Sequence, residues 1–150
     1  MILDHLLTLS QWHILTQQKV KSMENKYEKA LEVRRHVLGA DYVNAVMVKS
    51  DFIIPFQEFV TNFAWGEGWV DESLDLKVRS LVTVAIVTSL GQLEEVKLHI
   101  AGAIRNGASS AELAAVIKHC AIYAGIARGV AAMNIADVEL AKAKEAKDKY

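Results

Sequence analysis

The sequence predicts an all-α protein that folds as one helical domain. Its 150 residues are enough for a single domain of ordinary size. The chain contains one proline, and no stretch alternates apolar and polar residues in the way that is typical of a half-buried strand. Hydrophobic residues make up 52% of the chain and charged residues 23%, which indicates a globular protein with a packed core. We therefore expect a single-domain bundle of helices.

The first 22 residues form an extension to the domain that we assign to residues 23–150. Residues 2–15 are mostly apolar, but polar side chains interrupt them, so the segment is too short and too polar to cross a membrane. A basic leader and a small-residue cleavage site are lacking, and a signal peptide is therefore not expected. We expect an extension that can form a helix, with Trp12, Ile14 and Leu15 packed on the domain or on a neighbouring subunit.

Local signals mark the helices of the first half of the domain. A charged helix is predicted over residues 27–38 and ends at Gly39, because glycine readily adopts the left-handed conformation that follows a helix. A short helix over residues 41–49 follows, and Pro55 suits the first turn of the next one. Four aromatic residues form an apolar stripe that we expect to pack in the core: Phe52, Phe56, Phe59 and Phe63.

Caps mark the helices of the second half. Asp75 is predicted to cap a helix that ends at Gly91 and is apolar on almost every side, which indicates burial by neighbouring helices or by other subunits. Ser109 and Glu112 form the pattern of a capping box for another helix. The helices expected in this half cover residues 75–90, 92–106, 110–124 and a last segment from about residue 128 into the charged tail.

Small residues predict close contacts between helices. Alanine and glycine are dense over residues 101–103 and 121–132, and such residues let helix backbones approach each other. Together with the helix that is apolar all round, these segments indicate a subunit interface. We therefore expect a homo-oligomer.

Composition and charge exclude several other classes of partner. The formal net charge is −1, with 17 basic and 18 acidic residues spread along the chain, whereas nucleic-acid binding needs a basic cluster. Cys120 is the only cysteine, which excludes an intrachain disulfide and favours a reducing, cytoplasmic setting. No two histidines have the spacing of metal ligands on one helix, so a metal site is not expected.

An acid and an imidazole share one face of the helix over residues 92–106. Glu95 and His99 are four residues apart and therefore lie one turn above each other, at the border of the apolar face. Partial burial at such a border can shift the pKa of an ionisable group. A surface ion pair and a functional pair both fit this pattern. Gly102, which would leave space for a ligand, favours the functional interpretation.

A second acid lies in an aromatic and glycine-rich segment, Ala64-Trp65-Gly66-Glu67-Gly68-Trp69. We expect this segment to form a tight turn that holds Glu67 beside indole rings. A dry environment of this kind favours the protonated carboxyl group, which suits a general acid. The alternative is that the glycines serve only the turn and that Glu67 points into water.

These residues resemble the carboxymuconolactone decarboxylase family over most of the chain, from about residue 27 to residue 140. In the broader superfamily, alkylhydroperoxidase D-like thiol peroxidases carry two active-site cysteines at the positions of Gln92 and Glu95, so thiol peroxide chemistry is set aside for this chain. The motifs that carry the resemblance are Val33-Arg34-Arg35-His36-Val37-Leu38-Gly39, Asp51-Phe52, Phe56-Gln57-Glu58-Phe59, Ala64 to Trp69, Arg79-Ser80-Leu81, Leu90-Gly91, Glu94-Glu95, Leu98-His99, Asn106-Gly107 and Ala121-Ile122-Tyr123-Ala124-Gly125.

The resemblance implies an all-helical subunit of the alkylhydroperoxidase D-like type, assembled into trimers or hexamers. It also implies a cofactor-free carboxy-lyase of aromatic catabolism, which converts 4-carboxymuconolactone to 3-oxoadipate enol-lactone and carbon dioxide. The partner expected on this basis is a small carboxylate or lactone substrate. A different unsaturated or keto acid as substrate, and a helical oligomer that binds a small acid without turning it over, stay open.

Roles for individual residues follow from the implied reaction. We expect His99 to donate to the developing enolate oxygen or to protonate the ring carbon, with Glu95 setting its orientation and charge. Glu67 is the candidate for the other proton-transfer group. The candidates for substrate binding are Arg79 and Arg128, whose guanidinium groups suit carboxylates, together with Trp65 and Tyr123.

One segment departs from the family pattern. After Tyr123-Ala124-Gly125 the family usually has Val-Pro-Ala-Ala-Asn, whereas this chain has Ile-Ala-Arg-Gly-Val. If this segment lines the site, the substrate differs from the family's type compound. The alternative is that Arg128 caps the preceding helix or faces solvent.

Overall fold

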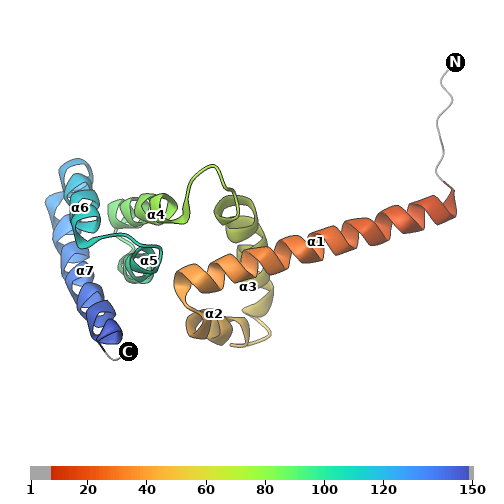
Figure 1. The fold of residues 1–150 in the computed structure, drawn as a ribbon, viewed down its shortest axis with the longest axis horizontal. Helices are drawn as coiled ribbons and strands as arrows, with labels where there is room; N and C mark the ends of the chain where they lie inside the picture. The colour runs from red at the N-terminus through yellow and green to blue at the C-terminus, as the bar shows by residue number, and fades with distance from the viewer. Residues whose placement is uncertain (1–7, 149–150) are drawn as a thin grey trace, which may run out of the picture.

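The computed structural model describes residues 8–148, and within this range the chain is helical with no strand, as predicted. Figure 1 shows α4 to α7 gathered in one group, with α1, α2, α3 and η1 forming a second group beside it. The predicted placement of the first seven residues lies outside the described range. The elements are α1 (Leu9–Leu38), α2 (Ala40–Met47), α3 (Ile54–Val60), the π-helix η1 (Thr61–Trp69), α4 (Leu76–Leu90), α5 (Leu93–Arg105), α6 (Ser110–Ala124) and α7 (Ile126–Lys147).

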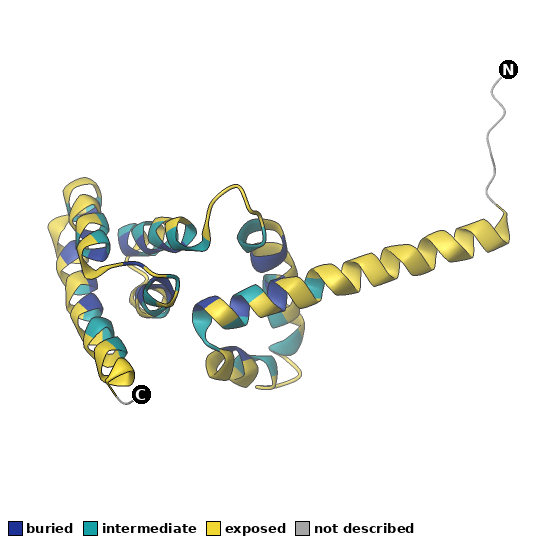
Figure 2. Cartoon of the chain, in the orientation of Figure 1, coloured by how far each residue is buried: buried dark blue, intermediate teal, exposed yellow. Residues whose placement is uncertain are grey.

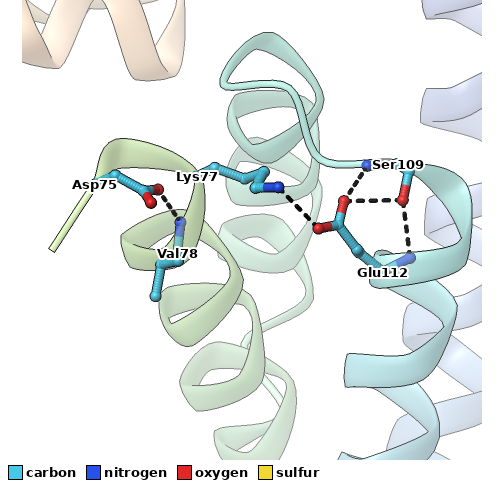
Figure 3. A network of polar contacts seen from close by, with 5 residues as sticks. All are labelled: Asp75, Lys77, Val78, Ser109 and Glu112. Carbon is cyan, nitrogen blue, oxygen red and sulfur yellow. Dashed lines mark hydrogen bonds and ion pairs between the residues drawn. The ribbon is translucent and has the colours of Figure 1, made fainter.

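The predicted caps of the second half are confirmed. The Asp75 carboxylate accepts from the backbone amide of Val78 at the start of α4, and α4 ends at Gly91 with a φ of 74°. At the start of α6, Ser109 and Glu112 exchange the two hydrogen bonds of a capping box. Figure 3 shows that Lys77 of α4 also reaches Glu112, so one carboxylate joins the starts of two helices.

The first helix is longer than predicted. It ends at Gly39 as expected but begins at Leu9, where Thr8 and Gln11 form a capping box, and it runs through residues 22 and 23 without a break. Neither glycine nor proline occurs between Thr8 and Gly39, so nothing in the sequence interrupts the helix. Figure 2 shows that the N-terminal half of α1 extends away from the body and is exposed. Helix α1 is long enough to span a bilayer, but no helix within residues 8–148 is apolar enough to do so.

The body of the molecule has two separate cores. The larger core is formed by α4, α5, α6 and α7 and contains buried side chains such as Ile100, Leu113 and Ile117. The smaller core lies between α1 and η1 and consists of Ala30, Val37 and Trp65, with partly buried neighbours. Helix α5 contacts both α1 and α7, so it connects the two groups of helices.

Close packing of α5 on α1 depends on Gly102, and this corrects one of our expectations. A Cβ atom at Gly102 would lie 2.7 Å from the backbone oxygen of Val37 and 3.0 Å from its Cγ1 atom. The same oxygen accepts two hydrogen bonds from Arg105, at 3.1 and 2.7 Å. The space beside Gly102 is therefore filled by α1 and leaves no room for a ligand.

Two expectations for the segment from residue 52 to residue 69 were wrong. The four phenylalanines do not pack in the core of the chain, because Phe52 is 92% exposed and the other three are at least 58% exposed. The segment around Glu67 is also not a tight turn, since residues 61–69 form the π-helix η1, which continues directly from α3. A π-helix of nine residues is uncommon, and such segments are frequent at functional sites.

Candidate active site

The side chain of His99 lies in the contact between the two groups of helices. It is 8% exposed, and its ring stacks on Trp69 with a centroid distance of 5.9 Å and an interplanar angle of 13°. Trp69 stacks in turn on Trp65, at 4.7 Å and 21°. Both tryptophans come from η1, which therefore supplies an aromatic stack that covers the imidazole and excludes water from it.

Burial controls the charge of His99. Desolvation lowers the pKa of His99 from 6.5 to about 4, so the imidazole is neutral at pH 7. Its Nδ1 atom is buried without a hydrogen-bond partner in the described part of the chain. Its Nε2 atom is 3.7 Å from the Oε2 atom of Glu95, which is longer than a hydrogen bond. A neutral ring with an unused nitrogen has the capacity to bind a further group.

Glu95 lies at the edge of this environment, as the sequence predicted. Its side chain is 53% exposed, whereas that of His99 is 10% exposed. The carboxylate therefore connects the buried imidazole with solvent. The predicted proximity of the pair and its position at the border of the core are both confirmed.

A buried arginine that the sequence analysis did not select lies on α1, the helix that α5 contacts. Arg34 of α1 is 4% exposed, and it donates to the Thr61 hydroxyl at 2.8 Å and to Gln57 Oε1 at 2.5 Å. None of the ion pairs formed by residues 8–148 involves Arg34, and its Nε atom is buried without a partner. Burial lowers the pKa of Arg34, and the charge of Glu95 is among the smaller influences that oppose this shift. The guanidinium is thus a buried cation with no partner of opposite charge in direct contact.

Helices α1 and α5 are in direct contact near the C-terminal end of α1. A Cβ atom at Gly102 would lie against Val37, and the Val37 backbone oxygen accepts two hydrogen bonds from Arg105. The charge of Glu95 on α5 is among the smaller influences on the pKa of Arg34 on α1. We call these residues the imidazole cluster: Arg34, Trp65, Trp69, Glu95 and His99.

Glu67 lies outside the imidazole cluster in the single chain. Its side chain is 64% exposed and forms an ion pair with Lys26 of α1, whose side chain is 48% exposed. The dry environment that the flanking tryptophans predicted is therefore absent. The reason is the π-helix, which directs Trp65 into the core and Glu67 toward solvent.

The guanidinium of Arg79, a candidate for carboxylate binding, already interacts with groups of its own chain. Its Nη2 atom donates to the backbone oxygen of Asp71 at 2.7 Å and is 3.8 Å from the Asp71 carboxylate. These contacts fasten the loop before α4 to α4 itself. The charge of Arg79, unlike that of Arg34, is therefore partly neutralised.

The remaining candidates, Arg128, Tyr123 and Trp65, lie on three different helices, α7, α6 and η1. Arg128 donates to the backbone oxygen of Ala124 at 3.2 Å, which fits the alternative that it caps the preceding helix. Its Nε atom also lies beside Gly91, four residues before Glu95. Tyr123 is 78% exposed, and its ring lies against His119 with a centroid distance of 4.7 Å. Trp65 is 4% exposed and its ring stacks on Trp69, so it presents no free face to a ligand.

Two members of the imidazole cluster, Arg34 and Trp69, were missed from sequence. Arg34 carried a usable signal, because it occupies the same helical face as the buried Leu31 and Val37. Trp69 is four residues after Trp65, but the sequence analysis expected a tight turn there rather than the helix on which the two rings stack. No three histidine, cysteine, aspartate or glutamate side chains within residues 8–148 are grouped as metal ligands.

Comparisons with known proteins agree with this arrangement. The chain matches the model of the carboxymuconolactone decarboxylase family over residues 55–138. It is 41% identical over 115 residues to a 4-carboxymuconolactone decarboxylase of Acinetobacter baylyi, a match that covers 76% of this chain and 86% of the relative. It is 37% identical over 110 residues to nitrosuccinic acid decarboxylase npaB of Metarhizium robertsii, covering 73% of this chain and 77% of that protein. This chain therefore belongs to the carboxymuconolactone decarboxylase family.

Proposed function

We propose that this protein is a cofactor-independent carboxy-lyase that converts 4-carboxymuconolactone to 3-oxoadipate enol-lactone and carbon dioxide. The relative from Acinetobacter baylyi, at 41% identity, supports this choice of substrate. The observation that carries the mechanism is the neutral, buried imidazole of His99 on α5, together with the buried cation of Arg34 on α1, the helix that α5 contacts.

The chemistry requires a place for negative charge. When the bond between the ring carbon and the departing carboxylate breaks, its electron pair passes through the ring double bond to the lactone carbonyl. The intermediate is a dienolate, and a proton must then reach a ring carbon. An enzyme accelerates such a reaction by placing donors where the charge develops.

His99 is the donor that the structure favours. Because its pKa is about 4, the neutral ring donates a hydrogen bond to the enolate oxygen without giving up its proton. Of the two roles expected from sequence, stabilisation of the oxygen is therefore preferred over direct protonation of carbon. The stack of Trp69 and Trp65 keeps water away and strengthens this interaction.

Arg34 provides the positive charge of the site. A buried cation without a carboxylate partner is unfavourable in the empty protein, and a bound anion relieves this. We assign to Arg34 the stabilisation of the anionic substrate and of the dienolate. Arg128, beside Gly91, is the candidate anchor for a second carboxylate, while Arg79 acts indirectly by holding the loop at Asp71.

Glu95 is the preferred proton carrier to carbon. It lies near His99 and is open to solvent, so it can be reprotonated after each turnover. Glu67 is the second candidate. It ranks below Glu95 because its carboxylate is exposed and requires a neighbouring subunit to bring it close to a substrate.

The assembly that we propose is a homo-oligomer, a trimer or a hexamer, in the cytoplasm. Large apolar side chains remain exposed on three helices, among them Ile86 at 53%, Ile122 at 65% and Ile126 at 68%. Monomeric proteins rarely expose contiguous apolar surface on this scale. Tyr123, which is equally exposed, would be covered in such an assembly and could face the site of a neighbour.

A second candidate function uses the same site with a different acid as the substrate. The relative from Metarhizium robertsii carries the name of a nitrosuccinic acid decarboxylase, and this chain departs from the family pattern around Arg128. Both observations favour a decarboxylase of another small acid whose departing carboxylate lies next to an electron-withdrawing group.

Decarboxylation assays on purified protein test both functions. We expect release of carbon dioxide from 4-carboxymuconolactone, and a loss of about 100-fold or more in kcat/KM for His99→Gln. His36→Gln, which alters an exposed histidine of α1, is the matched control and should leave turnover unchanged. Turnover of a different acid selects the second function. Thermal stabilisation by acids with no carbon dioxide release from any of them contradicts both and indicates a binding protein.

A further inference from the structure

The N-terminal part of α1 is an apolar helix without a covering surface in the single chain. We call residues 9–23 the arm, and Figure 2 shows that it is exposed along its whole length. Trp12 is 63% exposed, and Met23 is 62% exposed. An isolated helix of this length is only marginally stable in water, so the arm requires a partner surface.

The apolar side chains of the arm continue a face that is already used for packing. Leu9, Trp12 and Val20 recur with the spacing of one helical face, and the stripe ends at Met23. Continuing the same period along α1 leads to Ala30, which is fully buried against η1. The arm therefore carries the type of surface that the rest of α1 buries within its own subunit.

A complementary surface lies on α3 and η1. We call Phe52, Phe56, Phe59 and Phe63 the aromatic ridge, and each of these side chains is more than half exposed. The rings contact one another, with Phe59 and Phe63 stacked at 5.7 Å and 5°. The arm stripe extends over about 21 Å of α-helix. The ridge begins in the turn before α3, continues along α3 and ends in η1, so both surfaces are elongated.

Charge also favours this pairing. Lys19 borders the apolar stripe of the arm and is exposed, whereas Asp51 and Glu58 flank the aromatic ridge. Another apolar surface, a groove of about 420 Å³ between α6 and α7, is bordered by Lys118, which has the same sign as the arm. Electrostatic complementarity selects among surfaces of similar hydrophobicity.

We propose that the arm of one copy of this chain packs on the aromatic ridge of a second copy. A fully buried phenylalanine removes about 150–250 Å² from water, so covering four rings in each of two copies approaches the roughly 1,200–2,000 Å² of a stable interface. Gln57, which holds Arg34, and the tryptophan stack lie on the same two helices as the ridge. The exchanged arm thus covers the outer side of the helices that build the imidazole cluster. This contact does not depend on the identity of the reaction.

Assembly of arm and ridge variants of the full-length protein tests the proposal. Trp12→Glu and Phe59→Glu should each raise the dissociation constant of the assembly by about ten-fold or more, measured by sedimentation velocity, because each removes an aromatic anchor. Ile14→Glu is the matched control, since Ile14 is 55% exposed on another face of the arm, and it should leave assembly unchanged. Circular dichroism verifies that helix content is retained. A wild-type protein that stays monomeric, or unchanged assembly in both variants, overturns the proposal.

Cross-linking identifies the partner surface directly. In a Cys120→Ser background, Trp12→Cys combined with Phe59→Cys should form a disulfide between two chains under mild oxidation. The pair of Trp12→Cys with Val130→Cys, which borders the groove between α6 and α7, should not. A disulfide within one chain, or one formed only with residue 130, overturns the proposal in favour of docking on the arm's own ridge or on the groove.

Discussion

The two groups of helices differ in what they bury. In the group formed by α4 to α7, the core consists of apolar side chains such as Val84, Ile100 and Leu113. In the group formed by α1 to η1, five apolar residues are buried, namely Ala30, Leu31, Val37, Val43 and Trp65, and the cation of Arg34 and the hydroxyl of Thr61 are buried as well. The core cluster of the first group is apolar, whereas the second group also buries a charge.

Two arginines make the same contrast at the level of single residues. Arg79 of the first group has the Asp71 carboxylate at 3.8 Å, and its side chain is 17% exposed. Arg34 of the second group is more deeply buried and takes part in no ion pair formed by residues 8–148. A buried charge that is left without a partner costs several kcal/mol in principle. The proposed mechanism uses this difference, because it assigns the anion to Arg34 and a structural role to Arg79.

The largest effect is expected when the buried charge that distinguishes the two groups is removed. Replacement of Arg34 by methionine removes the buried cation and should lower kcat/KM by about 100-fold or more, while thermal stability stays equal or rises, because an apolar residue replaces an unpaired charge. Steady-state kinetics and thermal melting measure the two effects separately. Arg35→Met, at a half-buried neighbour that bonds Asn44, is the control for activity. A fall in stability with normal turnover would show that Arg34 only fastens α1 to α3.

The next prediction uses the pKa of His99. Because its pKa falls from 6.5 to about 4 on folding, the unfolded chain binds more protons between these two pH values. Stability is therefore complete above pH 6.5 and decreases as the pH falls toward 4, by about 3 kcal/mol for this residue.

Urea unfolding at pH 7, 5.5 and 4 measures this dependence. The slope assigned to His99 should disappear in His99→Gln, whereas His36→Gln should retain it because His36 is exposed. An identical pH dependence in wild type and His99→Gln would show that the imidazole is not desolvated in solution.

Replacing Gly102 or Gly129 by alanine tests one helix contact at a time. A Cβ atom at Gly129 would lie 2.5 Å from the Cβ atom of Ala121, between α6 and α7, while one at Gly102 would press on the backbone of Val37. Overpacking costs about 1–3 kcal/mol, offset by about 1 kcal/mol from the higher helix propensity of alanine. Both Gly102→Ala and Gly129→Ala should therefore lower stability, by chemical denaturation, by a similar amount.

Activity distinguishes the two glycine variants. Gly102 lies one turn after His99 on the contact with α1, so its replacement should separate His99 from Arg34 and reduce turnover. Gly129→Ala should leave turnover at temperatures below its melting point unchanged. Equal activity in both variants would show that the contact of α1 with α5 does not position the site.

Much of the fold could be predicted because its signals are local. Asp75, Gly91 and the box of Ser109 and Glu112 specify helix ends through hydrogen bonds within a few residues, and all of these ends were placed correctly. The proximity of Glu95 and His99 is equally local, since it follows from a spacing of one turn.

Most of the errors involve contacts between distant segments. A stripe of phenylalanines predicts that a face is covered but not whether the cover comes from the same chain. Gly66 and Gly68 suggested a turn, but the stacking of Trp65 and Trp69 over His99 accompanies a π-helix there instead. The residues around Arg34 in the sequence do not show whether a carboxylate pairs with it. That information depends on how α1, α3 and α5 pack together.

The smallest expected effect concerns the two acids of the proposed mechanism. The ion pair of Glu67 with Lys26 is exposed on both sides, and such pairs contribute about 0–1 kcal/mol, so Glu67→Gln should change stability by less than that amount. If Glu95 is the proton carrier, Glu67→Gln should change kcat by less than about three-fold, whereas Glu95→Gln should lower it by about 100-fold. Steady-state kinetics with the assembled protein measures both. The reverse order would assign proton transfer to Glu67, and it would require that a neighbouring subunit brings this carboxylate to the imidazole cluster.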